Sequence, residues 1–594
     1  MNAALYRDPA AAIDHRVEDL LARMTLEEKA GLLFQTMVTI NQDGSLVEDP
    51  AQAPTATARH MVDDLHMSHF NLLGSAGPRQ MAEWHNRLQE LAARTRLGIP
   101  VTLSSDPRHS FTDNPGTAML SGPFSQWPET LGLAAVGDPD LVRQYADTVR
   151  REYLAVGIRL ALHPQIDLAT EPRWSRINGT FGEDAELTSR LVKAYIEGLR
   201  GDGDVPGPDS VAAMVKHFPG GGPQKDGEDP HFAYGREQVY PGGRFDYHLR
   251  PFLAAIAAGA TQIMPYYGMP VGTRYEEVGF GFNKGVITGL LREQLGFTGI
   301  VVTDWGLVSD AEILGQPMPA RAWGVEHLSP LERAQKILDA GADQFGGEHV
   351  PELVVELVRS GRVDEQRLDV SVRRLLAEKF RLGLFDDRRY VDADAAEETV
   401  GHADLRALGD AAQRRSLTLL KNQDDLLPRN GRPKLYLQGV KAETAARYAE
   451  VVAEPTEADL AVLRLGTPHE PRPGAFEAHF HAGRLDFAPE RLKEILALLD
   501  AVPTVVAVHL ERPAVIPEIA EHAAALLAAY GASDEALLDT VFGRSLPEGR
   551  LPFQLPRSME EVEHGRPDVP QESPDPLFAF GHGLTLPTGA VSAP

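Results

Sequence analysis

The sequence predicts an α/β protein in which an N-terminal (β/α)8 TIM-type barrel is followed by a smaller α/β sandwich domain. Short apolar runs alternate with amphipathic helical stretches over the first 385 residues, and a second alternation of the same kind begins after residue 410. The 594 residues are enough for two or three domains with their own cores. A doubly wound open sheet would give a similar first alternation, so it stays an alternative for that domain.

The first predicted domain, residues 1–385, begins with helical periodicity. Residues 17–33 repeat leucine and methionine at helical spacing, and Thr25-Leu26-Glu27-Glu28 has the form of a capping box, so we expect a helix to begin there. Apolar runs follow, separated by amphipathic stretches such as 139–155, 185–199 and 283–295. The predicted strands are residues 70–73, 101–103, 160–162, 212–215, 262–264 and 300–303.

The second half of the chain predicts a linker and a second domain. Residues 386–410 are acidic and lose the apolar rhythm, which is typical of an interdomain linker. Residues 411–594 then form the predicted sandwich of helices on a mostly parallel sheet, with a proline-rich acidic tail from residue 556. Its predicted strands are 416–420, 435–440, 460–465, 504–510 and 523–530, and its predicted helices are 443–452, 490–499 and 534–542.

Composition and charge exclude several classes of protein. The chain has 85 acidic against 58 basic residues, a net charge of −27, which argues against a nucleic-acid partner or an anionic membrane. No apolar run approaches 18 residues, so no membrane span is expected. Cysteine is absent, which removes thiolate nucleophiles and thiolate metal sites. Residues 1–15 carry no apolar core of a secretory signal, so we expect a cytoplasmic protein.

Chemically capable side chains follow four of the predicted barrel strands. Asp106, Lys216-His217, Tyr266-Tyr267 and Asp304-Trp305 each stand at or just after the end of an apolar run. In a barrel all these strand ends meet at one mouth, where active sites are built. One such residue is usually a loop residue returning to water, but four together favour an active site.

The residues at this mouth point to carbohydrate chemistry. The sequence has no nucleophilic serine elbow, no Walker loop and no His-Glu-x-x-His helix. Carboxylates, an arginine, a Lys-His pair and aromatic rings are the groups that hold sugar hydroxyls and ring faces, and two carboxylates can cleave a glycosidic bond. His479-x-His481 lacks a third and a fourth ligand, so we predict no metal, and the chemistry needs no cofactor. A carbohydrate-active hydrolase is the leading hypothesis.

Several motifs, in order along nearly the whole chain, resemble those of the family 3 glycoside hydrolases. The matching segments include Met24-Thr25-Leu26-Glu27-Glu28, Glu171-Pro172-Arg173-Trp174-Ser175-Arg176, Lys216-His217-Phe218-Pro219-Gly220, Val302-Thr303-Asp304-Trp305 and Phe580-Gly581-His582-Gly583-Leu584. The resemblance implies a retaining, exo-acting β-glucosidase that acts on a β-glucoside or oligosaccharide. The sequence departs from the family pattern at Ser175, where glycine is usual, and at Gly221-Gly222, where many members have a histidine.

The resemblance also implies a role for each matching residue. Asp304 corresponds to the nucleophile. The groups that hold the terminal sugar correspond to Asp106, Arg176, Lys216 and His217, a Met-x-x-Tyr pair beside the nucleophile corresponds to Met264 and Tyr267, and Trp305 would stack on the leaving sugar.

The acid/base catalyst is the residue on which the sequence leaves most open. The glucosidase branch lends a glutamate from the second domain, and we predict Glu470, because flanking prolines would hold its loop extended. Glu477 and Glu511 compete for the role, since each follows or adjoins a strand end. In the N-acetylglucosaminidase branch an Asp-x-His unit serves instead, and Asp229-Pro230-His231 has that form. The acid/base and Asp304 carboxyls of a retaining enzyme are expected about 5–5.5 Å apart.

Three other hypotheses stay open at this point. The enzyme could be a β-N-acetylhexosaminidase or β-xylosidase with the same nucleophile. It could also be a non-catalytic sugar-binding protein, against which the joint presence of Asp304, Lys216, His217 and Arg176 speaks. The loops at 223–240 and 471–487 are long enough to reach a neighbouring subunit, so a homodimer is a further hypothesis.

Overall fold

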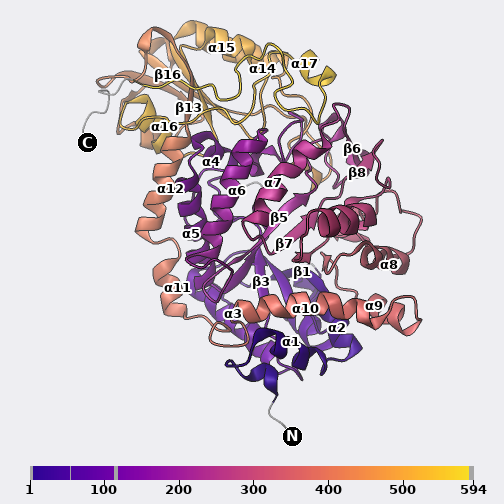
Figure 1. The fold of residues 1–594 in the computed structure, drawn as a ribbon. Helices are drawn as coiled ribbons and strands as arrows, with labels where there is room; N and C mark the ends of the chain where they lie inside the picture. Colours follow the sequence, from indigo (N-terminus) through magenta and orange to yellow (C-terminus); the bar gives the residue numbers. More distant parts are fainter. Residues whose placement is uncertain (1–3, 54, 113–117, 587–594) are drawn as a thin grey trace.

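The first domain is a parallel barrel of eight strands wrapped by helices. The computed structural model describes residues 4–53, 55–112 and 118–586, and Figure 1 shows the barrel below the second domain. The strand order is β12-β1-β2-β3-β4-β5-β7-β9, which follows the chain from β1 to β9 with β12 on the other side of β1. The strands are β1 (Phe34–Thr39), β2 (His69–Leu73), β3 (Thr102–Ser105), β4 (Ile158–Ala161), β5 (Ala212–Phe218), β7 (Gln262–Pro265), β9 (Ile300–Val301) and β12 (Phe345–Gly346).

Backbone hydrogen bonds join the two ends of this sheet. The Thr303 amide donates to the Gln344 carbonyl over 2.9 Å, and the Asp343 amide donates to the Val301 carbonyl over 2.8 Å. A sequential order with joined ends is that of a barrel, so the doubly wound alternative does not apply. The main covering helices are α1 (Ile13–Leu21), α2 (Leu26–Leu32), α3 (Pro78–Ala93), α5 (Pro139–Ala155), α6 (Ala185–Arg200), α7 (Phe245–Ala257), α8 (Pro330–Ala340), α9 (Pro351–Arg359) and α10 (Glu365–Arg381), with a further helix over Gly285–Gln294.

All six predicted barrel strands are confirmed, and two strands were missed. β1 continues almost directly from α2 and carries the polar residues Gln35 and Thr36, which obscured its strand pattern. β12 has only two residues, too few for a periodicity. The predicted capping box is confirmed, since the Thr25 side chain accepts from the Glu28 amide and the Glu28 carboxylate accepts from the Thr25 amide.

The second domain is a six-stranded sheet with helices on it. Its order is β13-β18-β17-β16-β14-β15, parallel except for the antiparallel pair β13–β18. The predicted helix 443–452 is wrong beyond Ala445, where α13 ends, and β15 follows at Glu450. The strands are β13 (Thr418–Asn422), β14 (Lys434–Gln438), β15 (Glu450–Val451), β16 (Leu460–Gly466), β17 (Thr504–His509) and β18 (Ala525–Ala529), and the helices include α13 (Ala442–Ala445), α14 (Pro489–Ala501), α15 (Pro517–His522) and α16 (Asp534–Val541).

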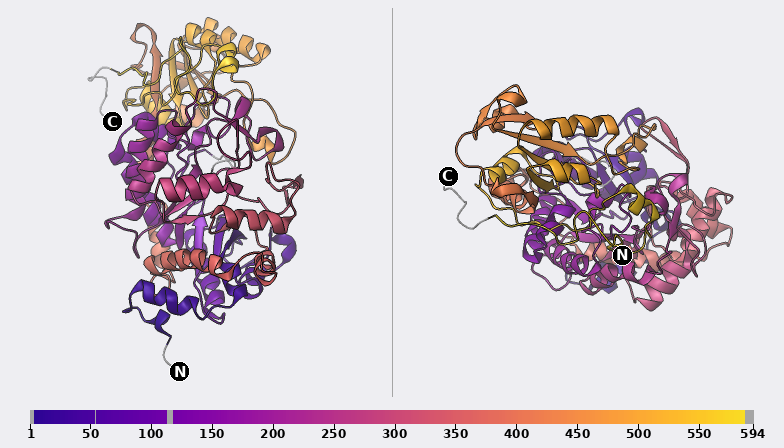
Figure 2. Two further views of the ribbon diagram at one scale, coloured as in Figure 1. Left: turned by 45° about the vertical axis from the view of Figure 1, so that its right-hand side comes forward. Right: turned by 90° about the horizontal axis from the view of Figure 1, so that it is seen from above.

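The segment between the domains is helical rather than irregular. α11 (Ala393–Thr399) packs on α3 and α5, and α12 (Ala403–Ser416) packs on α4 (Thr130–Val136) and α16. The acidic residues that suggested a linker begin α11, where Asp392 accepts hydrogen bonds from the first backbone amides. Both views in Figure 2 show the second domain seated on one end of the barrel.

The second domain covers the end of the barrel at which the strands terminate. The Glu129 amide, beyond β3, donates to the Tyr530 carbonyl over 2.8 Å, and the Glu183 amide, beyond β4, donates to the Pro552 carbonyl over 3.1 Å. The domain contact therefore lies over the predicted active-site mouth.

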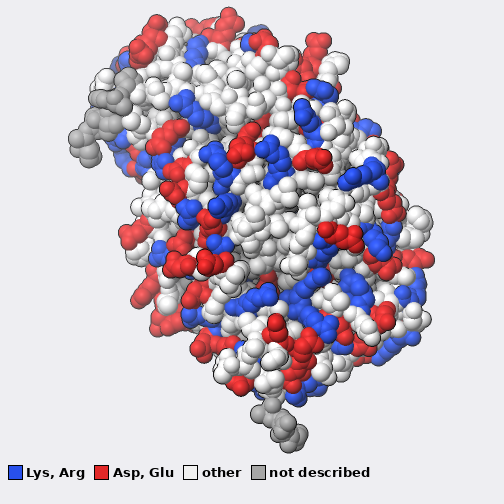
Figure 3. Space-filling model, viewed as in Figure 1, with Lys and Arg blue, Asp and Glu red and all other residues white. Residues whose placement is uncertain are grey.

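On the face drawn in Figure 3, acidic and basic side chains are interspersed. Among the described residues no helix is long and apolar enough to cross a membrane.

Candidate active site

An ion pair between the buried Lys216 and the partly buried Asp106 joins the ends of β3 and β5. The Lys216 ammonium donates to Asp106 Oδ1 over 2.7 Å, and Asn71 Nδ2, on β2, donates to Oδ2 over 3.0 Å. Burial raises the pKa of Asp106, but the Lys216 charge and the two hydrogen bonds outweigh burial and hold that pKa below its ordinary value. Asp106 is thus kept ionised, with further lone pairs for substrate hydroxyls. The sequence did not predict the part of Asn71.

Asp304 lies three residues beyond β9 with one carboxylate oxygen uncommitted. Its Oδ1 accepts from the Trp305 amide over 2.9 Å. Its Oδ2 is buried without a hydrogen-bond partner among the described residues, and the nearest basic nitrogen is His217 Nε2 at 4.0 Å. The whole residue is only 6% exposed. A buried carboxylate with one oxygen anchored and the other free is suited to attack on carbon.

His217 is oriented by a carboxylate that sequence reasoning missed. His217 Nδ1 donates to Asp167 Oδ2 over 2.9 Å, and the Gly221 amide donates to Asp167 Oδ1. Burial raises the pKa of Asp167 to about 6 and holds the pKa of His217 well below its ordinary value. The imidazole is therefore neutral near pH 7, and its Nε2 lone pair faces Asp304 as an acceptor for a hydroxyl. Asp167 follows β4 by six residues, and this position at a strand end was the available signal.

Arg176 adds a positive charge near Asp304. Its guanidinium carbon lies 5.9 Å from the centre of the Tyr266 ring, and the side chain is buried. Burial lowers the pKa of Arg176, but the surrounding groups, including Asp229 and Asp304, raise it above its ordinary value. Asp304 therefore lies within electrostatic reach of a permanent cation.

The Met-x-x-Tyr pair and Trp305 lie around Asp304, at or beyond the ends of β7 and β9. The Tyr267 hydroxyl accepts from the Trp305 amide over 3.0 Å, beside the bond that this amide makes to Asp304. Met264 is 3% exposed and pairs in register with Lys216 across β5 and β7. Trp305 is half-buried, so part of its ring stays open to a ligand. The structure thus brings all eight predicted barrel residues to one end of the sheet.

The Asp229-x-His231 unit is folded into a buried pair beside Tyr267. Asp229 Oδ1 accepts from His231 Nδ1 over 2.6 Å, and the His231 ring centre lies 4.6 Å from that of Tyr267. Burial raises the pKa of Asp229, but the His231 contact and Arg176 lower it overall, to about 2. This pair contacts Tyr267, a neighbour of Asp304, and has the form of a second acid/base candidate.

The three second-domain glutamates differ in where their side chains point. Glu470 is exposed, and its carboxylate packs over Gly483 with no hydrogen bond or ion pair to a described residue. Glu511 accepts from His481 Nδ1 over 2.6 Å, within its own domain. Glu477 is 9% exposed and accepts from the hydroxyl of Tyr234, a barrel residue. Of the three, only Glu477 has a side-chain hydrogen bond to the described barrel.

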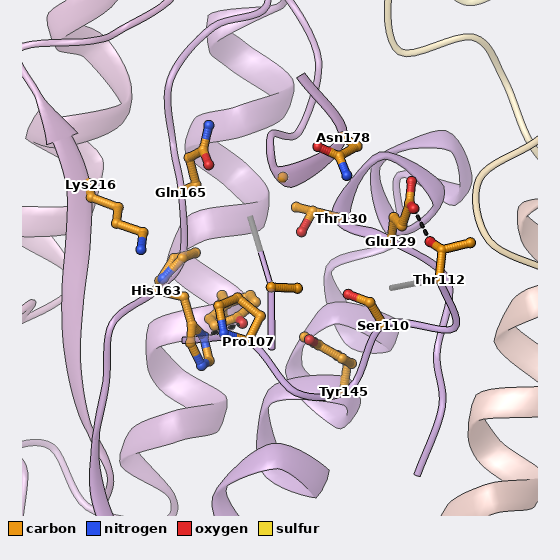
Figure 4. Close-up of a pocket in the computed structure, with 14 residues that line it drawn as sticks. Pro107, Ser110, Thr112, Glu129, Thr130, Tyr145, His163, Gln165, Asn178 and Lys216 are labelled. Carbon is orange, nitrogen blue, oxygen red and sulfur yellow. Dashed lines mark hydrogen bonds between the residues drawn. The ribbon is translucent and has the colours of Figure 1, made fainter. Parts of the chain in front are cut away.

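A polar side pocket opens behind Lys216. Figure 4 shows Lys216 and His163 on one side of it and Glu129, Thr130 and Asn178 on the other. Burial raises the pKa of Glu129 to about 8, so its carboxyl is largely protonated at neutral pH. Its Oε1 accepts from the Thr112 hydroxyl and lies 3.5 Å from His509 Nε2 of the second domain. Sequence reasoning gave no signal for Glu129.

The described residues contain no group of three or more metal-binding side chains.

Residues 25–377 match the model of the glycosyl hydrolase family 3 N-terminal domain, and residues 430–586 match that of the family 3 C-terminal domain.

Relatives and solved structures agree with this match. The chain is 54% identical to a probable β-glucosidase C of Aspergillus flavus, over 100% of this chain and 93% of that protein. It is 42% identical to a periplasmic β-glucosidase/β-xylosidase of Dickeya chrysanthemi, over 98% of this chain and 90% of that protein. A β-glucosidase structure from Erythrobacter marinus shares the fold, with a TM-score of 0.80 and 23% identity over 98% of this chain and 84% of that one. The chain belongs to glycoside hydrolase family 3.

Proposed function

We propose that this family 3 enzyme is an exo-acting β-glucosidase that hydrolyses terminal β-glucosyl residues with retention of configuration. The observation that carries the proposal is the free Oδ2 of Asp304, buried beside Arg176 and the neutral His217 ring. The ionised Asp106 and the ammonium of Lys216 supply an acceptor and a donor for the hydroxyls of one sugar. The β-glucosidase named in Aspergillus flavus supports glucose as that sugar.

The proposed reaction is a double displacement. Asp304 Oδ2 forms a bond to the anomeric carbon while the glycosidic bond breaks, and a general acid gives its proton to the departing oxygen. The resulting base then takes a proton from water, whose oxygen attacks the same carbon and releases Asp304 as a carboxylate. Two inversions return the original configuration.

For the acid/base we propose Glu477 ahead of Glu470. The contact with the barrel residue Tyr234 supports Glu477, whereas Glu470 makes no such bond among the described residues. Around Glu477, Phe476 and Phe480 pack on the His231 ring with centres 6.2 and 4.9 Å away, and His231 in turn contacts Tyr267. A continuous set of contacts therefore connects the Glu477 loop to the nucleophile.

Glu477→Ala and Glu470→Ala are a matched pair that tests the choice. We expect Glu477→Ala to lower kcat/KM about 10²–10⁴-fold on alkyl β-glucosides and far less on 2,4-dinitrophenyl β-glucoside, whose leaving group needs no proton. Azide should restore turnover as glucosyl azide, and Glu470→Ala should change kcat/KM less than about threefold. The reverse pattern assigns the role to Glu470. If neither variant shows leaving-group dependence with azide rescue and His231→Asn does, the Asp229–His231 pair is the acid/base.

A β-xylosidase activity is the second candidate, because the Dickeya chrysanthemi relative carries both activities in its name. Comparing kcat/KM on aryl β-glucoside, β-xyloside and N-acetyl-β-glucosaminide separates this candidate and the hexosaminidase alternative from the proposed one.

The cytoplasmic location and the homodimer stay predictions. The loops at 223–240 and 471–487 that suggested a dimer contact each other within one chain, as in the Arg472–Glu228 ion pair at 2.8 Å. Fractionation of the source cells and light scattering of the purified protein are the respective tests.

A further inference from the structure

Two contacts clamp the second-domain loop that carries Glu477 onto the barrel. Glu477 accepts a hydrogen bond from the Tyr234 hydroxyl, and Arg472 Nη2 donates to both carboxylate oxygens of Glu228 over 2.8 and 2.9 Å. Tyr234 and Glu228 lie on one barrel loop, beyond β5, while Arg472 and Glu477 lie on one second-domain loop, beyond β16. Each bond therefore crosses the seam between the two domains.

The two contacts are also coupled to each other. The Arg472 guanidinium carbon lies 5.6 Å from the centre of the Tyr234 ring, within the range of a cation–π contact. Tyr234 also stacks on Phe232, with ring centres 5.5 Å apart and planes at 12°. Tyr234 thus contacts both Phe232 and Arg472, although it is 52% exposed. These two contacts restrict the directions in which its hydroxyl can point.

The hydroxyl keeps its proton and so acts as a donor. Burial and the neighbouring Glu477 hold the pKa of Tyr234 above its ordinary value, although Arg472 acts in the opposite direction. The protonated hydroxyl therefore donates to a Glu477 oxygen. The other charged groups near Tyr234 and Glu477 are Arg472 and Glu228. The β10–β11 hairpin (Ala311–Ile313, Gln316–Met318) also contacts this loop, since Gln316 accepts a hydrogen bond from the Phe476 amide over 3.3 Å.

We propose that Tyr234 is a positioning residue by which the barrel aims the second-domain acid/base, Glu477, at the glycosidic oxygen. The inference rests on the proposed function, since it needs Glu477 to be that acid/base. Tyr234 does not touch the reacting atoms. It acts by holding one carboxylate oxygen of Glu477, which leaves the other for proton transfer, and a small displacement of a catalytic group lowers the rate by large factors.

Tyr234→Phe removes the hydroxyl and keeps the ring that contacts Phe232 and Arg472. We expect kcat/KM to fall about 10–100-fold on methyl β-glucoside and less than about threefold on 2,4-dinitrophenyl β-glucoside. On methyl β-glucoside the loss should appear in kcat and leave KM near the parent value, because a displaced acid/base affects the transition state and not substrate binding. The melting temperature should stay within about 2 °C of the parent enzyme.

Tyr436→Phe is the matched control. The Tyr436 hydroxyl also makes a hydrogen bond, from Gln438 Nε2 over 3.1 Å, but it lies on β14 within the second domain. We expect this variant to keep the parent kcat and KM on both substrates.

The outcomes separate failure of the inference from failure of the proposed function. If Glu477→Ala shows azide rescue while Tyr234→Phe keeps the parent kcat on methyl β-glucoside, or loses activity equally on both substrates, the positioning role is overturned and the acid/base assignment stands. If Glu477→Ala shows neither azide rescue nor dependence on the leaving group, the acid/base assignment fails and the role of Tyr234 falls with it.

Discussion

The floor and the cover of this active site are built in different ways. The floor residues Asp106, Lys216 and Asp304 stand at the ends of neighbouring strands in one hydrogen-bonded barrel. The cover is a second-domain loop, held to the barrel by side-chain contacts such as Tyr234–Glu477 and Arg472–Glu228. The sheet fixes the floor through backbone geometry, whereas the position of the cover depends on how two domains dock.

This difference matters because the proposed function gives the two parts different roles. In that proposal the floor holds one sugar through the charges of Asp106 and Lys216, and loss of a buried charge partner is expensive. The cover would bring the proton donor to the bond that breaks, and its contribution would depend on the leaving group. Floor variants should therefore lose activity on every substrate, while cover variants should lose it selectively.

The largest expected effect comes from the nucleophile on the floor. Asp304→Asn should lower kcat about 10⁴-fold or more on good and poor leaving groups alike, because no covalent intermediate can form. Steady-state kinetics on both substrates measures this, with Asp339→Asn on the exposed face of α8 as the control. Retention of more than about a tenth of the parent activity would point to another nucleophile.

The next effect concerns the ion pair beneath the sugar. Lys216→Met should lower kcat/KM about 10²–10³-fold on all substrates, since Asp106 stays buried without its cation. Loss of the ammonium also raises the pKa of Asp106, so the acidic limb of the pH profile should move to higher pH. Lys225→Met removes an exposed lysine on the neighbouring loop and should change kcat/KM less than about twofold. A leaving-group dependence in Lys216→Met would contradict the separation of floor and cover.

A smaller effect is expected in stability, at the seam between floor and cover. The pKa of Glu129 is raised from 4.5 to about 8, so the unfolded chain ionises first and the fold loses stability as the pH rises from about 4.5 to 8. Glu129→Gln removes this loss. Between pH 5 and pH 8 its free energy of unfolding should therefore rise by about 1–4 kcal/mol relative to that of the parent.

Urea unfolding at the two pH values measures this change. Glu398→Gln, on the exposed side of α11, is the control and should show no such trend. Equal pH dependence in the parent enzyme and Glu129→Gln would mean that Glu129 is ionised in the fold.

The same contrast explains what could be predicted from the sequence. The strand-end rule identified Asp106, Lys216, His217, Tyr267 and Asp304, because a barrel brings consecutive strand ends together whatever the loops do. It could not rank Glu470, Glu477 and Glu511, since each follows or adjoins a strand end and their orientations depend on loop packing. Asp167 was missed because it lies six residues beyond β4, farther than the residues at or just after a strand end that were singled out. Glu129 was missed because it lies 24 residues beyond β3, where the apolar pattern carries no information.

The central claim is that Asp304 becomes covalently glycosylated. A 2-deoxy-2-fluoro-β-glucosyl inactivator traps that intermediate, and mass spectrometry of the digested protein locates the label. We predict one label per chain, on Asp304, released with time as the enzyme regains activity. A label on a different carboxylate, or inactivation without any covalent adduct, would contradict the account.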